Sequence, residues 1–321
     1  MRVCKCGGML IKYGFLKKEK TQRYKCKKCS RFCSDADKRT FSTLRSKPEK
    51  VLLVLKLLTE GMGIRGSARI AGCHRDTVLR ILKLAGQRSY KLLEKKLKEV
   101  PVKHVEADEV WTFVKKKSEA GVDPDKDFNP WGDFYVFFAL ESQSKLLMMP
   151  TIGKRSENAT WRFADSLNRS TSGRFQITTD GFRPYKNAVK ETMGSRVDFA
   201  QFYKEYNMLQ ANKKLTNYNR AMKDSQHLYV IRSGNPERSR ITTSHVERLN
   251  LSLRTYNRRF NRKTICFSKD EEYLSYSVYL FAAWYNFCRP HMSLEKEETP
   301  AMRQGLADRK WSIQELLTGR D

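Results

Sequence analysis

Residues 244–260 read SHVERLNLSLRTYNRRF, and two faces of one helix can be recognised in this stretch. Its apolar residues recur at steps of three and four, as expected for an amphipathic helix packed on a core: Val246, Leu249, Leu253, Tyr256 and Phe260. A second line, about 100° away at 3.6 residues per turn, carries Glu247, Asn250, Arg254 and Arg258. A single Glu among arginines is usually a solvated ion-pair residue. It becomes a candidate functional acid only if other segments supply acids to the same place.

The composition indicates a polyanionic partner. The 321 residues include 63 Lys and Arg against 35 Asp and Glu, a formal charge of +28. Such an excess favours nucleic acid over a membrane surface. No apolar run approaches the roughly 20 residues that cross a bilayer, and the polar segment after Met1 does not resemble a signal peptide. We therefore expect a protein of two or three domains that is cytoplasmic, associated with the nucleoid, and has no membrane partner.

Residues 1–45 are predicted to form a structural zinc ribbon. Cys26 and Cys29 have the C-x2-C spacing of a zinc knuckle, and a spacer of nineteen residues separates them from Cys4 and Cys6, which form a C-x-C pair. Four thiolates satisfy tetrahedral Zn²⁺, and clustered cysteines are typical of metal binding in a reducing compartment. The unusual first pair leaves open that Cys33 replaces Cys4 or Cys6. Free buried thiols are the alternative interpretation.

The charge of this first segment favours contact with a phosphate backbone. Residues 1–50 contain 16 Lys and Arg against four acidic residues, a balance of +12. A small metal-stabilised module with this charge is typical of proteins that bind nucleic acid through phosphates. A zinc ribbon that contacts only protein is the alternative.

Residues 46–90 are predicted to form a helix-turn-helix domain. After a first helix that opens at Pro48, the sequence GIRGSARIAGCHRDTVLRILKLAG predicts helices at 64–70 and 74–84, separated by a turn that contains Gly72. Polar residues open the last helix, so Arg75, Thr77 and Arg80 are expected to face the major groove of DNA. An ordinary helical hairpin is the alternative. Residues 91–100 are predicted to be a charged linker helix.

Residues 101–300 alternate between strand and helix patterns. Three strands in a meander are followed by helix, strand, helix, strand and helix, which is the order of the ribonuclease-H-like fold. The expected strands are 102–114, 133–142, 145–153, 174–181 and 196–202, and the expected helices are 156–169, 185–193, 244–260 and 271–290. Residues 204–240 are interpreted as a polar insertion, and 301–321 as a C-terminal tail. The chain is thus expected to be an α+β multidomain protein with a mixed-sheet catalytic domain.

Acids in two of these strands can reach the same edge of the sheet. Asp180 ends an apolar strand and is followed by a glycine, where a carboxylate emerges into a crevice. In the first strand, Glu106 and Asp108 share a face while Glu109 points the other way, so spacing alone leaves Glu106 and Asp108 as candidates. Carboxylates are hard oxygen ligands that suit Mg²⁺ or Mn²⁺. Two such ions about 3.5–4 Å apart catalyse in-line phosphoryl transfer, and Glu247 is a third candidate ligand.

With these motifs in this order, the sequence resembles the Asp-Asp-Glu (DDE) transposases of the insertion sequence one family. The likeness covers nearly the whole chain, from RYKCKKCSRF through DEVWTFV, TTDGFRPY, TSHVERLNLSLR and RKTICFSK to YNFCRPH. The resemblance implies Asp108 rather than Glu106 as the first acid, and it implies that Asp108, Asp180 and Glu247 bind two Mg²⁺ (or Mn²⁺) ions. Arg254, seven residues after the Glu, is implied to hold a DNA phosphate or base, and Arg258 lies on the same predicted line. His245 is expected either to assist the Glu or to have a structural role.

The implied function is DNA transposition. A homo-oligomer would bind the terminal inverted repeats of its element, cleave their ends by hydrolysis and join the freed 3′ hydroxyl to target DNA. A retroviral-type integrase or a structure-specific nuclease is one alternative, and a nuclease would yield cut but no joined DNA. The other alternative is a catalytically silent, sequence-specific DNA-binding regulator.

Overall fold

The computed structural model describes residues 4, 6–16, 21–34, 46–206 and 225–318. The chain divides into two compact units, residues 1–52 and 53–321. Among the described residues, no helix combines the length and the apolar character needed to span a membrane.

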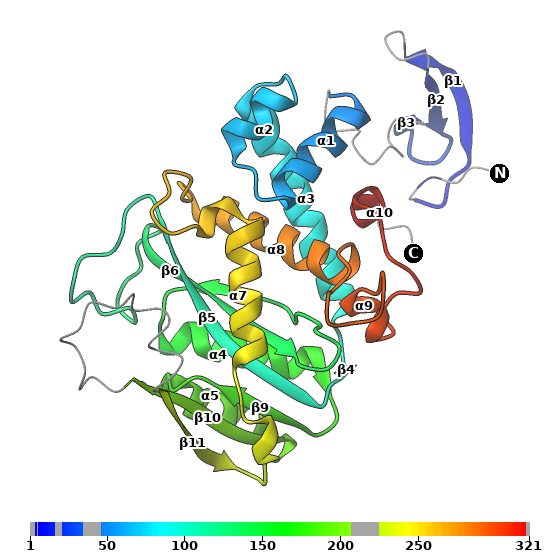
Figure 1. The fold of residues 1–321 in the computed structure, drawn as a ribbon. Coiled ribbons are helices and arrows are strands. Elements are labelled where there is room, and N and C mark those ends of the chain that lie inside the picture. Colours follow the sequence, from blue (N-terminus) through cyan, green and yellow to red (C-terminus); the bar gives the residue numbers. More distant parts are fainter. Residues whose placement is uncertain (1–3, 5, 17–20, 35–45, 207–224, 319–321) are drawn as a thin grey trace. The chain divides into compact units, whose positions relative to one another are not determined.

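The first unit contains a three-stranded antiparallel sheet, with strand order β1-β2-β3 (Figure 1). Its strands are β1 (Leu10–Leu16), β2 (Thr21–Cys26) and β3 (Phe32–Ser34). The register of β1 against β2 shifts between Lys12 and Phe15. Tyr24 and Cys26, two residues apart on β2, are buried and therefore share one face of the sheet.

The helical region confirms the predicted turn but changes one boundary. It comprises α1 (Pro48–Thr59), α2 (Ile64–Ile70) and α3 (Arg75–Lys96). Gly72 has a φ of 55°, a conformation that glycine adopts without strain. The prediction of a separate linker helix at 91–100 was wrong, because α3 continues unbroken to Lys96. Leu92 and Leu93 are buried and prolong its inner stripe.

The second unit is built around a six-stranded mixed sheet with order β11-β10-β9-β5-β6-β7. Strands β5, β9 and β10 run parallel, whereas β6, β7 and β11 each pair antiparallel with a neighbour. The strands are β5 (His104–Val114), β6 (Gly132–Glu141), β7 (Thr151–Gly153), β9 (Phe175–Thr179), β10 (Val197–Tyr206) and β11 (Ser225–Ser233). A short parallel pair joins β4 (Val100–Pro101) to β8 (Thr171–Ser172).

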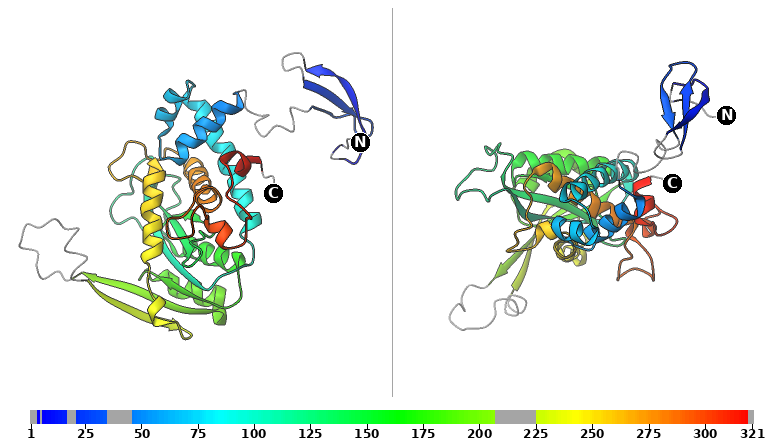
Figure 2. Two further views of the ribbon diagram at one scale, coloured as in Figure 1. Left: turned by 45° about the vertical axis from the view of Figure 1, so that its right-hand side comes forward. Right: turned by 90° about the horizontal axis from the view of Figure 1, so that it is seen from above.

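Helices cover both faces of this sheet (Figures 1 and 2). On one face lie α4 (Glu157–Ser170) and α5 (Pro184–Met193), where Phe163 packs against Phe137 of β6 with ring centroids 5.7 Å apart. On the other face lie α7 (Ser244–Tyr256) and α8 (Glu271–Phe287), followed by α9 (Pro300–Arg303) and α10 (Ile313–Thr318). The close approach of α3 to α8 depends on Gly86, since a Cβ there would lie 2.4 Å from Tyr276 Cβ.

The meander and the alternating helices and strands follow the predicted order, with three differences. Strand β7 is limited to three residues. Before it, Leu147 makes only an isolated bridge to Leu140, and its backbone N–H and C=O bond instead to the Asn286 side chain of α8. Strand β11 was not predicted; it pairs with β10 inside the expected insertion, of which 207–224 lie outside the described residues. Helix α7 ends at Tyr256 rather than at residue 260. Asn257 caps it and begins a short 3-10 turn, Arg258–Phe260.

Candidate active site

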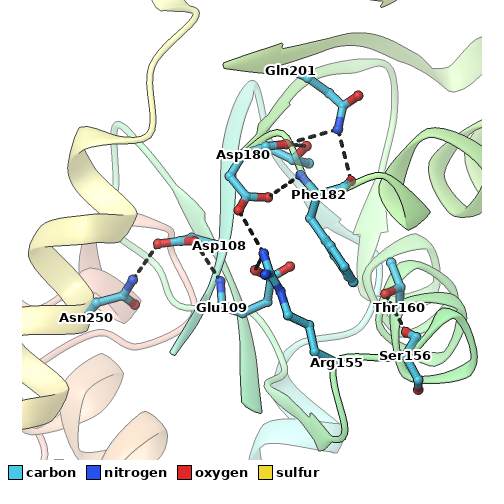
Figure 3. A network of polar contacts seen from close by, with 10 residues as sticks. Asp108, Glu109, Arg155, Ser156, Thr160, Asp180, Phe182, Gln201 and Asn250 are labelled. Atoms are coloured by element: carbon cyan, nitrogen blue, oxygen red, sulfur yellow. Dashed lines mark hydrogen bonds and ion pairs between the residues drawn. The ribbon is translucent and has the colours of Figure 1, made fainter. Parts of the chain in front are cut away.

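The register of β5 and β9 places two predicted acids side by side. These strands pair in parallel up to Ala107 opposite Thr179. Asp108 directly follows Ala107, and Asp180 directly follows Thr179. Both acids therefore lie at the point where β9 ends. Figure 3 shows the Asp108 carboxylate next to Asn250 of α7 and the Asp180 carboxylate next to Arg155.

A third carboxylate joins them. Asp108, Glu109 and Asp180 each offer an oxygen within 4.8 Å of the others. Strand alternation does turn Glu109 away from Asp108, towards the face that α4 and α5 cover. Asp180 follows the end of β9 and is within reach of both residues. The sequence prediction therefore missed Glu109; the signal that could have found it is an acid adjacent to a predicted ligand at a strand end.

Burial and mutual repulsion make this cluster costly to ionise. Burial, and next the charge of Asp180, raises the pKa of Asp108 to about 6. The same two causes raise the pKa of Glu109 to about 8, and burial raises the pKa of Asp180. Oε1 of Glu109 is buried without a hydrogen-bond partner among the described residues. Closely spaced carboxylates with a free oxygen fit a divalent cation, which would replace protons as their counter-charge.

Arg155 supplies one positive charge to the cluster. Its Nη2 lies 3.3 Å from Glu109 Oε2 and 3.4 Å from Asp180 Oδ2. The guanidinium also stacks over the ring of Phe182, 4.2 Å from the ring centroid. Arg155 directly precedes Ser156, whose hydroxyl caps α4. The ordered start of this helix thus fixes where the arginine enters the site.

Backbone contacts hold Asp180 in place. Its Oδ1 accepts a hydrogen bond from the backbone N–H of Phe182 at 3.0 Å. The fully buried amide of Gln201 donates to the main-chain oxygens of Asp180 and Phe182 at 3.0 and 3.1 Å. The loop that carries Asp180 is therefore anchored to the neighbouring strand β10, independently of the charge on its carboxylate.

Helix α7 positions Asp108 through Asn250. The Asn250 side-chain amide donates to Asp108 Oδ2 at 2.7 Å, while the backbone N–H of Glu109 donates to Oδ1 at 2.8 Å. Asn250 is buried in this contact. Asn250, a member of the polar line read from the sequence of this helix, thus contacts an acid of the sheet.

Glu106, the other candidate for the first acid, has a different role. Its Oε2 accepts from the backbone N–H groups of His245 and Val246 at 2.8 and 3.1 Å, in the first turn of α7. Its Oε1 lies 2.5 Å from Nδ1 of His245. A carboxylate at a helix N-terminus satisfies free N–H groups and interacts favourably with the helix dipole. Glu106 and His245 therefore dock α7 on the sheet, which leaves Asp108 as the acid facing Asp180.

Glu247 lies near the acid cluster but outside the three-carboxylate group of the described residues. Its Oε1 accepts a hydrogen bond from Thr243 at 2.8 Å. Its negative charge nevertheless contributes to the raised pKa values of Asp108 and Asp180. Burial, and next the charge of Arg262, lowers the pKa of Arg254, and the charge of Asp108 opposes this shift. Arg258 leaves the predicted line, because α7 has already ended.

The predicted zinc ligands come together in the first unit. Cys4, Cys6, Cys26 and Cys29 offer thiols that all lie within 4.8 Å of one another. The Sγ atoms of Cys4 and Cys29 are 3.7 Å apart, and those of Cys6 and Cys26 are 3.5 Å apart. Zn–S bonds of about 2.3 Å in a tetrahedron separate sulfurs by roughly 3.8 Å, so the four thiols fit Zn²⁺.

The thiols of this group interact with one another. A backbone hydrogen bond from Cys29 is the largest cause that lowers the pKa of Cys26, to about 6, which favours the thiolate that a metal requires. Against a backbone hydrogen bond from Arg31, the thiol of Cys6 raises the pKa of Cys29 to about 12, so a metal ion would have to replace the proton of that thiol. Gly8 is needed beside the thiols, because a Cβ there would lie 2.7 Å from Cys26 Sγ. Cys33 stands on β3 opposite Tyr24 and is not part of the four-thiol group.

The residues predicted to contact DNA lie in the first two turns of α3. Arg75 and Arg80 are exposed and Thr77 is half-buried at the start of α3. A cavity of about 1090 Å³ lies beside them, and its lining includes Arg65, Arg69, Arg75 and Arg258. Several guanidinium groups therefore line one hollow, and that of Arg75 also pairs with Asp76 at 3.5 Å.

Comparisons with known proteins give weak likenesses only. No family model matches the sequence, and no curated protein matches it. A solved piggyBac transposase synaptic complex with hairpin DNA aligns at 9% identity over 88% of this chain and 71% of that chain, with a TM-score of 0.39. Two Mos1 structures, a strand transfer complex and a paired-end complex with the left transposon end, each align at 14% identity over 48% of this chain. These two alignments cover 58% and 59% of the Mos1 chains, with TM-scores of 0.21 and 0.22. Scores this low establish neither a shared fold nor a shared function.

Proposed function

We propose that this protein is a DNA transposase of the DDE type, with residues 101–300 as a ribonuclease-H-like catalytic domain. The observation that carries the proposal is the meeting of the Asp108 and Asp180 carboxylates where β9 ends, with α7 docked against them. The resemblance to the insertion sequence one family selects the same two acids from sequence motifs alone. Glu247, on the facing helix, is proposed as the third acid of the triad.

Five residues of the site have proposed tasks. Asp108 and Asp180 hold divalent ions, and Asn250 fixes the direction of the Asp108 carboxylate. When bound, two Mg²⁺ or Mn²⁺ ions activate the attacking oxygen and stabilise the leaving oxygen of a phosphodiester. Arg254 holds a DNA phosphate beside the acids, while Glu106 keeps α7 at the distance this arrangement needs. Water attacks first at the ends, and the freed 3′ hydroxyl attacks target DNA second.

DNA recognition is assigned to the basic modules before the catalytic domain. The zinc ribbon binds the phosphate backbone, and Arg75, Thr77 and Arg80 of the helix-turn-helix read the terminal inverted repeats. Arg258 contributes to the same surface beside the cavity. A homo-oligomer on paired ends, in the cytoplasm and associated with the nucleoid, completes the proposal.

Product mapping tests this function. The protein is incubated with Mg²⁺, a target plasmid and DNA that carries the flanks of its own gene, and the strands are sequenced. We expect cuts at fixed end positions and new joints between those 3′ ends and the plasmid. The matched control is DNA of the same length with scrambled ends, which should give neither product. Cuts without joints would indicate a nuclease, and binding without either product would indicate a silent regulator.

A further inference from the structure

One face of the first sheet combines exposed aromatic rings with cations. Residues Ile11, Tyr13, Arg23, Lys25 and Phe32 form this aromatic–cationic face. Ile11 pairs with Lys25, and Lys25 pairs with Phe32, so the three share a side of the sheet, and alternation along β2 adds Arg23. Tyr13 lies within the register shift of β1, and the contact of its ring with Phe32 places it on the same face. Tyr13 is 50% exposed, Phe32 45% and Ile11 37%. The buried residues of β2, Tyr24 and Cys26, alternate with Arg23 and Lys25 and therefore lie on the opposite side.

The rings and cations of this face are in contact with one another. The centroids of Tyr13 and Phe32 are 5.0 Å apart, with ring planes inclined at 57°. The Arg23 guanidinium lies 4.2 Å from the centroid of Phe32, and Lys25 Nζ lies 5.8 Å from the centroids of both rings. The two rings are therefore presented to solvent with positive charge directly beside them.

The charge around this face selects the kind of partner. Residues 1–34 contain eleven Lys and Arg, and Glu19 is the single acid among them. Repulsion opposes the docking of a second copy of the same surface, while a polyanion is attracted. Rings that lie open beside cations match nucleic acid whose bases are free to stack. A duplex hides its base faces within the stack and would leave both rings without a partner.

We propose that the aromatic–cationic face binds single-stranded DNA, with unpaired bases stacked on Tyr13 and Phe32 and the backbone held by Arg23 and Lys25. The inference rests on the proposed function only for the source of such strands, which are the ends opened during cleavage and joining. It assigns to the ribbon a task different from that of the helix-turn-helix, which is suited to a duplex groove.

Binding of defined oligonucleotides to the full-length, zinc-loaded protein tests the proposal. Fluorescence anisotropy compares a labelled oligo-dT with an abasic strand of the same length and charge. Stacking predicts that oligo-dT binds more tightly, and that Tyr13→Ala and Phe32→Ala each weaken its binding by about tenfold. Both variants should bind the abasic strand as the parent does. Arg23→Gln should instead reduce the salt dependence of binding, by roughly 0.7 in the log–log slope.

Three controls make the outcome decisive. Phe128, 90% exposed in the second unit, provides a matched ring, and Phe128→Ala should leave oligo-dT binding unchanged. Tyr13→Phe keeps a ring and should bind as the parent does. One zinc per chain in every variant verifies that the ribbon is folded. Equal binding of oligo-dT and the abasic strand, or unchanged binding after both ring substitutions, would overturn the proposal. If the parent protein bound oligo-dT as predicted but joined no DNA ends to a target, the proposed function would fail and the proposal of single-strand binding would stand.

Discussion

Replacing Asp180 by Asn should lower DNA end cleavage and joining by roughly 10³-fold or more, while binding to the ends is unchanged. The substitution keeps the size of the side chain and an oxygen that can accept from the Phe182 backbone N–H, now at 3.0 Å. Gln201 holds the same loop through main-chain oxygens and is unaffected. The change therefore removes the negative charge that a divalent ion requires and little else. Gel assays of cleaved, joined and bound DNA measure the three quantities separately.

A carboxylate elsewhere on the sheet serves as the matched control. Asp198 lies at the start of β10, opposite Gln176 rather than next to the acid cluster, and it pairs with Arg174 at 2.6 Å. Asp198→Asn should cleave and join DNA like the parent. Near-normal cleavage by the Asp180→Asn protein would show that the Asp180 carboxylate is not part of the catalytic site. Weakened end binding with normal chemistry in assembled complexes would also contradict the assignment.

Removal of zinc is expected to unfold the ribbon and to weaken end binding by about 100-fold, because several phosphate contacts are then lost together. The sheet of the first unit is small, and β2 turns Tyr24 and Cys26 towards its buried side. A module of this size rarely folds without a metal or disulfides. A chromogenic chelator reports zinc release, the dispersion of amide NMR signals reports folding, and anisotropy reports DNA binding.

The cysteines themselves provide the control for this prediction. Cys29→Ala removes a member of the four-thiol group and should reproduce the effect of the chelator. Cys33→Ala, on β3 and outside that group, should retain zinc, folding and DNA binding. If chelation left both the amide dispersion and end binding unchanged, the structural zinc site would be refuted. Zinc loss in the Cys33→Ala protein would show that Cys33 is itself a zinc ligand, contrary to the assigned set of four.

Much of the fold follows from local patterns. The burial of Val246, Leu249 and Leu253 agrees with the stripe expected for α7, because that stripe needs only a helix and an adjacent core. Ser156, where the helix 156–169 is expected to begin, caps α4. The parallel pairing of the strands that lead to Asp108 and Asp180 follows from the order of elements, since a helix between two strands allows a parallel crossover.

The rest of the site depends on contacts between distant segments. Arg155 reaches Asp180 from the loop before α4, and no local pattern indicates that direction. The role of Glu106 depends on where the first turn of α7 docks on β5, almost 140 residues further along the chain. Glu109 joins the acids only because Asp180 stands beyond the end of its strand. Helix α7 ends early because Asn257 bonds to Ser277 of α8, another long-range contact.

Locating bound Mn²⁺ by anomalous X-ray scattering tests most directly whether these carboxylates form a metal centre. In crystals of the full-length protein grown with Mn²⁺, we predict an anomalous peak within about 2–2.5 Å of carboxylate oxygens of both Asp108 and Asp180. The remaining ligands will show whether Glu109, Glu247 or both complete the site, and crystals of the Asp180→Asn protein should lack the peak. The central claim would be contradicted if, at saturating Mn²⁺, anomalous peaks appeared only at other sites and none lay next to Asp108 and Asp180.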